Sequence, residues 1–388
     1  MFRMAVGHSD DVDPEAAAET IVAQCEQALN GVEPKAGLLF CTFDTDHQAV
    51  LAGVRNGFPD IVLIGSTSSG EMSSVLGFRE DSVTLALFAS DEIDFTAGLG
   101  TDLSIDIQAA ARQAVEQARR GTKKEPRLCI TTPSVRIGNP TALLAHLSSQ
   151  IGEGVEVFGG GAVAQTTRGA GADAYQFYND TVTQDSVPLL LLSGPLSYSF
   201  GIDTGWKPVG PKARVTRASD GEVYEIDGEP ALAFFERYLG PGAEPAVANP
   251  LAVFEDDSEQ FYLRAPIFHD RSSGSVRFAG GVPENVTVQL TVAATDEIFE
   301  GTQSALSKAL GAYPEGADPQ AALVFSCAIR KFLLGTRTGN ELEMMREAFG
   351  AAMPICGFYS LGEIAPLESV GPARFHNETI VAILLGST

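Results

Sequence analysis

The feature that most constrains this chain of 388 residues is a seven-residue pattern that occurs twice, far apart. Residues 65–71 read GSTSSGE and residues 357–363 read GFYSLGE, so both fit G-x-x-S-x-G-E. Each copy follows a short apolar run and precedes another. Self-similarity of this kind is typical of a chain built from repeated structural units.

The elements around the two patterns share an order, which predicts the repeat unit. An apolar strand, a helix and a second strand lead into the pattern, and a further strand closes the unit; these lie at 38–41, 48–56, 61–64 and 81–88, and again at 322–327, 341–349, 354–356 and 379–385. A weaker middle copy has its elements at 127–130, 141–150, 155–158 and 186–192. A strand and a helix precede each copy, with Asp13, Asp102 and Asp296 as candidate N-caps.

We therefore expect an α/β fold in which three β-α-β-α-β-β units form mixed sheets covered by helices. Residues 195–285 differ, because short alternating runs are bounded there by Gly and Pro, with a tight-turn signal at Asp227-Gly228. This pattern predicts a strand-rich inserted segment. The expected organisation is a region 1–194 with two units, and a region 195–388 with the segment 195–285 and a third unit at 286–388.

Composition narrows the partners and the compartment. The formal net charge is -24, which disfavours nucleic acid and anionic membrane surfaces as partners. No apolar run approaches the roughly 18 to 20 residues of a membrane helix, and the N-terminus lacks a signal core. Five singly placed cysteines argue against a disulfide framework. We expect a cytoplasmic protein without a membrane partner.

Several motifs in this order resemble the FIST family, over about residues 25–386. They lie at 65–71, 205–210 (GWKPVG), 224–231 (Y-x-I-D-G-x-x-A), 327–330, 357–364 and 375–379. The resemblance implies that 1–194 is the FIST N-terminal region and 195–388 the C-terminal region of a bacterial sensory protein. It also implies signal transduction through a small ligand, amino acids among the proposed ones, to a separate partner such as a histidine kinase.

The two glycine-bearing turns are the first candidates for the ligand site. Glycines let a ligand approach the backbone, serine hydroxyls and amides bind a carboxylate, and glutamates bind an amine. The candidate residues of the two turns are Gly65, Ser66, Ser68, Glu71, Gly357, Tyr359, Ser360 and Glu363. The alternative is a strand-end turn that needs glycine for its backbone conformation alone.

Arginines that follow apolar strands are the second candidates. Arg264 and Arg330 each follow such a strand, and a guanidinium there can bind a carboxylate through two hydrogen bonds. Arg337 is a further candidate, and a surface ion pair is the alternative for all three. We expect a pocket where the two turns and Arg330 converge.

Cofactor and catalytic signals are weak. No cofactor or metal is expected from the residues; haem, and with it nitric oxide sensing, follows only from the family resemblance, with His8 and His376 as candidate ligands. Neither histidine shows metal-ligand spacing, so a structural histidine is the alternative.

The motifs of common hydrolases and nucleotide-binding enzymes are absent. We expect a non-catalytic protein; a small-amide hydrolase with Cys327 or Ser360 as nucleophile is the rival, and a scaffold without a ligand is another.

Overall fold

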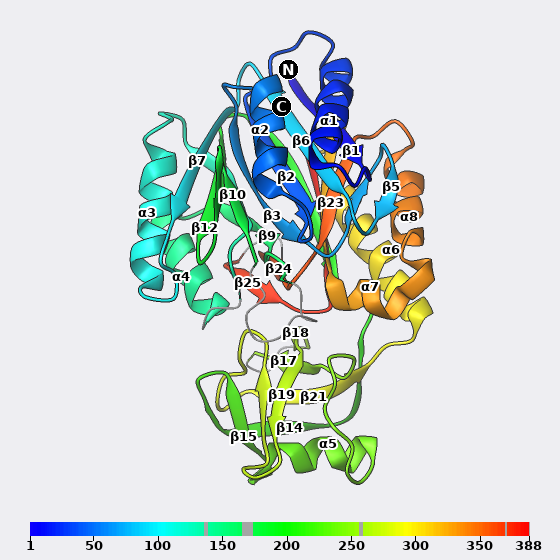
Figure 1. Cartoon of the computed structure of the whole chain (residues 1–388). Coiled ribbons are helices and arrows are strands. Elements are labelled where there is room, and N and C mark those ends of the chain that lie inside the picture. The colour runs from blue at the N-terminus through cyan, green and yellow to red at the C-terminus, as the bar shows by residue number, and fades with distance from the viewer. Residues whose placement is uncertain (136–138, 165–173, 256–258, 369–370, 388) are drawn as a thin grey trace.

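The computed structural model describes residues 1–135, 139–164, 174–255, 259–368 and 371–387. It confirms the α/β class, with mixed sheets and outer helices (Figure 1). The first unit contains β1 (Phe2–Ser9), α1 (Pro14–Leu29), β2 (Ala36–Thr42), α2 (His47–Gly57), β3 (Val62–Ser68), β4 (Glu71–Ser73), β5 (Gly77–Arg79) and β6 (Val83–Ser90). The second contains β7 (Asp94–Gly100), α3 (Ile107–Arg119), β8 (Pro126–Thr131), α4 (Pro140–Ile151), β9 (Glu156–Gly160), β10 (Gln176–Tyr178), β11 (Thr181–Thr183) and β12 (Val187–Ser193).

The third unit is interrupted after its first strand. It contains β13 (Leu196–Asp203), α6 (Thr295–Gly311), β22 (Ala321–Cys327), α7 (Ala328–Leu334), the 3-10 turn η2 (Gly335–Arg337), α8 (Asn340–Phe349), β23 (Ile355–Ser360), β24 (Glu363–Pro366), β25 (Ala373–His376) and β26 (Ile380–Ser387). Because β13 pairs with β26, it belongs to the third sheet although it precedes the inserted segment. The division of the chain at residue 195 stays a prediction.

A two-stranded hairpin from each unit pairs with the sheet of another unit. The strand orders are β1-β6-β2-β3-β10-β11, β25-β24-β9-β8-β12-β7 and β13-β26-β22-β23-β4-β5. The first sheet thus receives the hairpin of unit 2, the second that of unit 3, and the third that of unit 1. Within the units, β2–β3, β8–β9 and β22–β23 are parallel pairs. The exchange is cyclic and ties the three units into one body.

The three sheets surround a common apolar core, and the helices cover their outer faces. Core residues come from all three sheets, and Phe40 of the first stacks on Phe358 of the third with ring centroids 4.2 Å apart. A second cluster joins α1 and α2 to the other face of the first sheet. This two-sided burial explains why the strands read as continuous apolar runs. No helix among the described residues is long and apolar enough to cross a membrane.

The inserted segment is a separate strand-rich layer that lies below the three-unit body in Figure 1. It contains β14 (Lys207–Ser219), β15 (Glu222–Ile226), β16 (Glu229–Pro230), α5 (Ala231–Leu239), β17 (Leu251–Phe254), β18 (Phe261–Arg264), β19 (Pro266–Asp270), β20 (Ser275–Phe278) and β21 (Thr287–Val292). It has an apolar core of its own, formed with α5. The expected turn is present, with Asp227 and Gly228 at φ 53° and 76°.

Two of the three expected helix caps differ from the prediction. Asp13 does cap α1, accepting hydrogen bonds from the amides of Glu15 and Ala16. Helix α3 begins later than expected and is capped by Asp106, whereas Asp102 adopts a left-handed φ of 59° in the preceding turn. Asp296 lies in the first turn of α6 and does not cap it, because this helix has no side-chain N-cap. Instead, the Glu297 carboxylate accepts from the amide of Ala294 at 2.7 Å.

Candidate functional site

The two glycine-bearing turns meet at the centre of the three-unit body, in a ring of backbone hydrogen bonds. The Ser69 amide donates to the Tyr359 carbonyl, and the Tyr359 amide donates to the Gly70 carbonyl, both at 2.9 Å. The same two bonds recur between units 3 and 2 (Leu361 to Gly161, Gly161 to Gly362) and between units 2 and 1 (Val163 to Thr67, Thr67 to Tyr175). The three turns are therefore equivalent, and each is hydrogen-bonded to the other two. We call residues 65–71 corner 1, the turn that begins at Gly159 the middle corner, and residues 357–363 corner 3.

Glycine begins each corner because the neighbouring strand is too close for a side chain. A Cβ at Gly65 would lie 1.8 Å from the Leu39 carbonyl oxygen, and one at Gly357 would lie 2.2 Å from that of Val324. At Gly159 of the middle unit it would lie 1.8 Å from the Thr131 oxygen. The first glycine of each pattern is therefore required by close packing. The alternative considered from the sequence, a need for glycine backbone conformation, fits the second glycines, Gly70 and Gly362, which have φ values of 128° and 85°.

In corner 1, buried polar side chains form a hydrogen-bond network around Glu71. Ser68 and Ser82 both donate to its carboxyl group, and Ser82 is 2.9 Å from Nε2 of His8. Nδ1 of His8 is 2.8 Å from the Ser73 hydroxyl, so both ring nitrogens have partners. Burial raises the pKa of Glu71 to about 8 and lowers the pKa of His8 to about 4. At neutral pH the network is therefore uncharged for the most part.

Corner 3 repeats this arrangement around Glu363, with a thiol added. The Ser360 hydroxyl donates to one carboxyl oxygen at 2.9 Å, and the Thr379 amide to the other at 3.2 Å. The Cys327 thiol also contacts this carboxyl group. Burial raises the pKa of Glu363 to about 8 and that of Cys327 well above its ordinary value.

The middle corner has an amide in place of the carboxyl group. Gln176 occupies the position of Glu71 and Glu363 and accepts from the Ser186 hydroxyl at 3.1 Å. Ala162 replaces the corner serine. Corners 1 and 3 are thus the two that carry an ionisable group.

The remaining turn candidates are packed inside the protein. Ser66 is fully buried, and its hydroxyl has no partner among the described residues. Tyr359 is 1% exposed and donates to Glu341 at 2.6 Å. Neither turn lines any of the three cavities described below, within the part of the chain that the structure describes.

The three candidate arginines have three different environments. Arg330 is 0% exposed and forms an ion pair with Glu341 at 2.7 Å, with further bonds to Thr204, Ile298 and Thr302. Arg337 forms a surface ion pair with Asp296 at 2.9 Å, which is the alternative considered for it. Each arrangement occupies the guanidinium with protein groups.

Arg264 is buried in the joint between the inserted segment and unit 3. Its guanidinium donates to the carbonyls of Leu263, Gly281 and Phe375 at 3.0, 2.8 and 2.7 Å. It also lies over the Tyr262 ring, 4.3 Å from the centroid. Burial lowers the pKa of Arg264 to about 10, so it stays charged at neutral pH.

Neither candidate histidine is placed as a free metal or haem ligand. Nε2 of His376 is 3.0 Å from the Ala365 carbonyl oxygen, and burial lowers the pKa of His376 to about 3. His8 is held by two serines, as described above. Across the described ranges, no group of three or more His, Cys, Asp or Glu is arranged to hold a metal ion.

A cavity of about 220 Å³ lies in the joint, beside corner 3. We call it the joint cavity; it is lined by Ile202, Asp203, Thr204, Glu259, Gln260, Phe261, Tyr262, Leu263, Lys308, Leu367, His376 and Thr379. Its wall contains an ammonium group, Lys308, paired with Asp203 at 2.6 Å. Thr379 connects the wall to Glu363, and His376 is the strand partner of Glu363.

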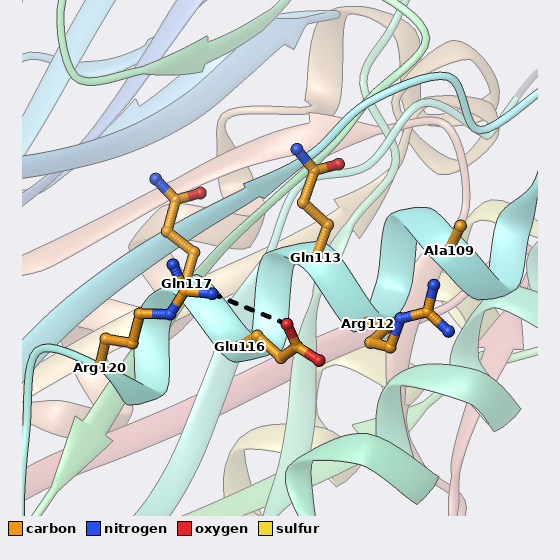
Figure 2. A pocket seen from close by; sticks show the side chains of 6 residues that line it. All are labelled: Ala109, Arg112, Gln113, Glu116, Gln117 and Arg120. Carbon is orange, nitrogen blue, oxygen red and sulfur yellow. Dashed lines mark ion pairs between the residues drawn. The ribbon is translucent and has the colours of Figure 1, made fainter.

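Two other concave surfaces are lined by few elements. One of about 440 Å³ lies around Arg55, which donates to Asn179 at 3.0 Å. The other lies along one face of α3, where Glu116 and Arg120 form an ion pair (Figure 2). There Gln113 and Gln117 accept from the amides of Thr101 and Leu99, at 3.3 and 3.0 Å. These glutamines cap backbone groups at and just beyond the edge strand β7, which is a structural role.

Comparison with protein families identifies the chain. The FIST N domain matches residues 35–229 and the FIST C domain matches residues 231–366. The chain belongs to the FIST family, whose domains serve sensing and signal transduction. The resemblance seen in the sequence motifs is thereby confirmed.

Individual relatives and solved structures do not narrow the function further. An uncharacterized protein of Methanocaldococcus jannaschii is 24% identical over 200 residues, which are 50% of this chain and 37% of that protein. The match therefore spans about a third of the relative's length. A cyanuric acid hydrolase from A. caulinodans covers 100% of both chains at 10% identity, with a TM-score of 0.37. T. maritima PurL in complex with AMPPCP gives a TM-score of 0.24 at 14% identity. Neither likeness is high enough to carry an argument.

Of the residues that line the joint cavity, His376 was named from the sequence, as a candidate haem ligand, and the others were not found. Asp203 ends a strand and Lys308 lies in the last turn of a helix more than a hundred residues later, so no local spacing connects them. Tyr262 lies two positions before the candidate Arg264, which is a further local signal. Glu341 was missed as well, although it is the partner of Arg330 and Tyr359.

Proposed function

We propose that the chain is a non-catalytic sensor that binds a small ligand, an amino acid or related metabolite, in the joint cavity. The observation that carries the proposal is the cavity itself. It combines a carboxylate, an ammonium group and aromatic faces between two separately packed parts of the chain. Its volume is below the roughly 300–1,000 Å³ typical of drug-sized ligands, which restricts the ligand to a small molecule.

The position of the cavity supplies a route for a signal. One wall contains β18 of the inserted segment, and another belongs to unit 3 and contains His376 and Thr379. Two further contacts cross the same joint, from Arg264 to Phe375 and from Ala265 to Asn377. A ligand that binds both walls favours one arrangement of the two parts, and a separate partner such as a histidine kinase would respond to that arrangement.

Two rival functions have less support. A haem sensor needs an accessible imidazole, and the contacts of His8 and His376 do not favour one. A hydrolase needs an activated nucleophile; Ser360 and Cys327 both lie against Glu363, so distance does not remove this rival. All three side chains are buried, and none of them lines a cavity described above, so no described cavity gives a substrate access to them, which argues against this rival.

The test is a thermal-shift screen of amino acids and related metabolites. A ligand at 100 times its Kd stabilises the native state by about 2.7 kcal/mol, which is readily measured. We expect at least one amino acid to raise the Tm of the wild type, and Lys308→Gln to reduce that shift. Lys207→Gln is the matched control, because Lys207 is exposed and lies outside the cavity. The proposal fails if no compound shifts the Tm, or if both variants respond as the wild type does.

A further inference from the structure

Helix α3 and the turn after it are basic, in a chain whose net charge is -24. From the start of α3 to the next strand, residues 107–125 contain five basic and two acidic residues. The corresponding stretches of units 1 and 3, residues 14–35 and 295–320, contain one basic residue each, with four and five acidic residues. The three helices are equivalent, because each packs on the edge strand that begins its own unit. The basic character is therefore particular to unit 2 and is not a requirement of the fold.

Two of the five basic side chains have structural partners. Arg119 donates to the carbonyl of Ile151, at the end of α4. Lys124 forms an ion pair with Asp94 of β7 at 2.8 Å. These contacts explain why the two residues are basic.

The other three are Arg112, Arg120 and Lys123, which are all exposed; we call them the basic face. Arg112 and Lys123 have no ion pair or hydrogen bond within the described residues. Arg120 is 78% exposed, and its ion pair with Glu116 is long, at 3.8 Å, so it contributes little to stability. Figure 2 shows Arg112 and Arg120 on either side of Glu116 along the helix. The basic face is thus available to another molecule.

The helix dipole explains only part of this pattern. Basic side chains are stabilising at the end of a helix, where Arg119 and Arg120 lie. Arg112 lies in the middle of α3, and Lys123 lies beyond its end. Their charges therefore need another explanation.

The edge of the sheet beside α3 is closed to strand pairing. Gln113 and Gln117 accept from the amides of Thr101 and Leu99, so these amides are not free to pair with a strand of another protein. A partner here has to contact the side chains of α3 and of the turn that follows. Basic side chains at such a surface favour acidic groups.

The helix that carries the basic face also packs toward the joint. The apolar cluster under α3 contains residues of α4 and Phe375 of unit 3. The Phe375 carbonyl accepts from Arg264 at 2.7 Å, across the joint. A partner on α3 would therefore contact a helix that shares one packed core with the joint.

We propose that the basic face is a docking surface for an acidic segment of a separate protein, the partner that receives the signal. Charge complementarity supports this occupant, because it selects partners and speeds their association. A nucleic acid and a second copy of the chain both fit less well, since the net charge of -24 repels each of them. The inference rests on the proposed function only for the signal, and the docking does not require the joint cavity.

The test is the fluorescence anisotropy of a labelled polyglutamate peptide at low ionic strength, without any small ligand. We expect the wild type to bind it, and added salt to weaken the binding, because exposed charges are screened. The triple variant Arg112→Gln, Arg120→Gln, Lys123→Gln should bind about tenfold more weakly or worse. Arg112→Gln alone, which breaks no contact among the described residues, should weaken binding in the same direction.

The matched control is the triple variant Lys207→Gln, Arg217→Gln, Arg237→Gln. These residues are exposed, lie in the inserted segment, and give a variant of the same net charge. It should bind the peptide as the wild type does, and both triple variants should keep a Tm near that of the wild type, since surface ion pairs contribute little.

Four results would overturn the inference. They are no binding by the wild type, equal binding by the two triple variants, tighter binding of a labelled single-stranded DNA than of the peptide, and self-association of the wild type at low salt that the basic-face variant loses. The last two would identify a nucleic acid or a second copy as the occupant. A failed amino acid screen would refute the ligand and leave the docking result standing, and a failed peptide test would leave the ligand site standing.

Discussion

The buried carboxyl groups Glu71 and Glu363 make the stability of the protein depend on pH. Their pKa values are raised from 4.5 to about 8 in the folded chain. The folded state therefore holds protons that the unfolded state releases, and their stabilising contribution is complete below pH 4.5 and lost as the pH rises through about 8. His8 acts in the opposite direction and at lower pH: its pKa is lowered from 6.5 to about 4, so its contribution is complete above 6.5 and lost as the pH falls through 4.

Glu71→Gln should flatten this dependence. Gln176 of the middle unit shows that an amide is accommodated at this position and accepts from the neighbouring serine. We expect the unfolding free energy of the wild type to fall between pH 6.5 and 8 by up to about 1.4 kcal/mol per pH unit for each such carboxyl group. Urea denaturation at several pH values measures the slope. The same slope in Glu71→Gln as in the wild type would contradict the assignment.

Gly65→Ala tests the close approach that defines the corners. Its Cβ would meet the Leu39 carbonyl oxygen, a backbone atom that cannot move aside alone. We expect a loss of about 3 kcal/mol or more, measured by chemical denaturation. Gly311→Ala is the control, because nothing lies within 4 Å of its added Cβ at the end of α6. That variant should be unchanged or up to about 1 kcal/mol more stable.

At the scale of elements, the Arg330 side chain connects its own helix α7 with three other segments. Its ion pair reaches α8, and its other bonds reach α6 and the residue after β13. Arg330→Met leaves Glu341 as an unpaired buried charge, so we expect a loss of about 3–5 kcal/mol. Arg330→Met combined with Glu341→Gln should recover part of this loss, since the remaining amide is neutral. Equal losses in the single and double variants, by urea denaturation, would show that the ion pair is not the cause.

The order of helices and strands within the units could be predicted from local patterns. Residues 141–150 were expected as a helix and form α4 (Pro140–Ile151); residues 341–349 were expected and lie within α8. The cap of α3 was misplaced because Asp102 and Asp106 both precede an apolar stretch, and only the backbone conformation distinguishes them. The environment of Arg330 could not be predicted, since its partner Glu341 has no local signal.

At the scale of the whole molecule, the cyclic exchange of hairpins determines where the glycine-bearing turns lie. It brings the turn of unit 1 against β23 of unit 3, as the repeated pattern led us to expect. Which sheet accepts which hairpin cannot be predicted from the sequence, because each hairpin is short and pairs with a single strand. The joint cavity depends in turn on the inserted segment, whose position beside unit 3 has no local sequence signal either.

The central claim is that a small molecule binds between the inserted segment and unit 3. Hydrogen–deuterium exchange with and without the compound that stabilises the protein most tests this claim directly. We predict slower exchange in β18 (Phe261–Arg264) and in residues 376–379, the two walls of the joint cavity. Protection confined to other segments, with both walls unchanged, would contradict the claim.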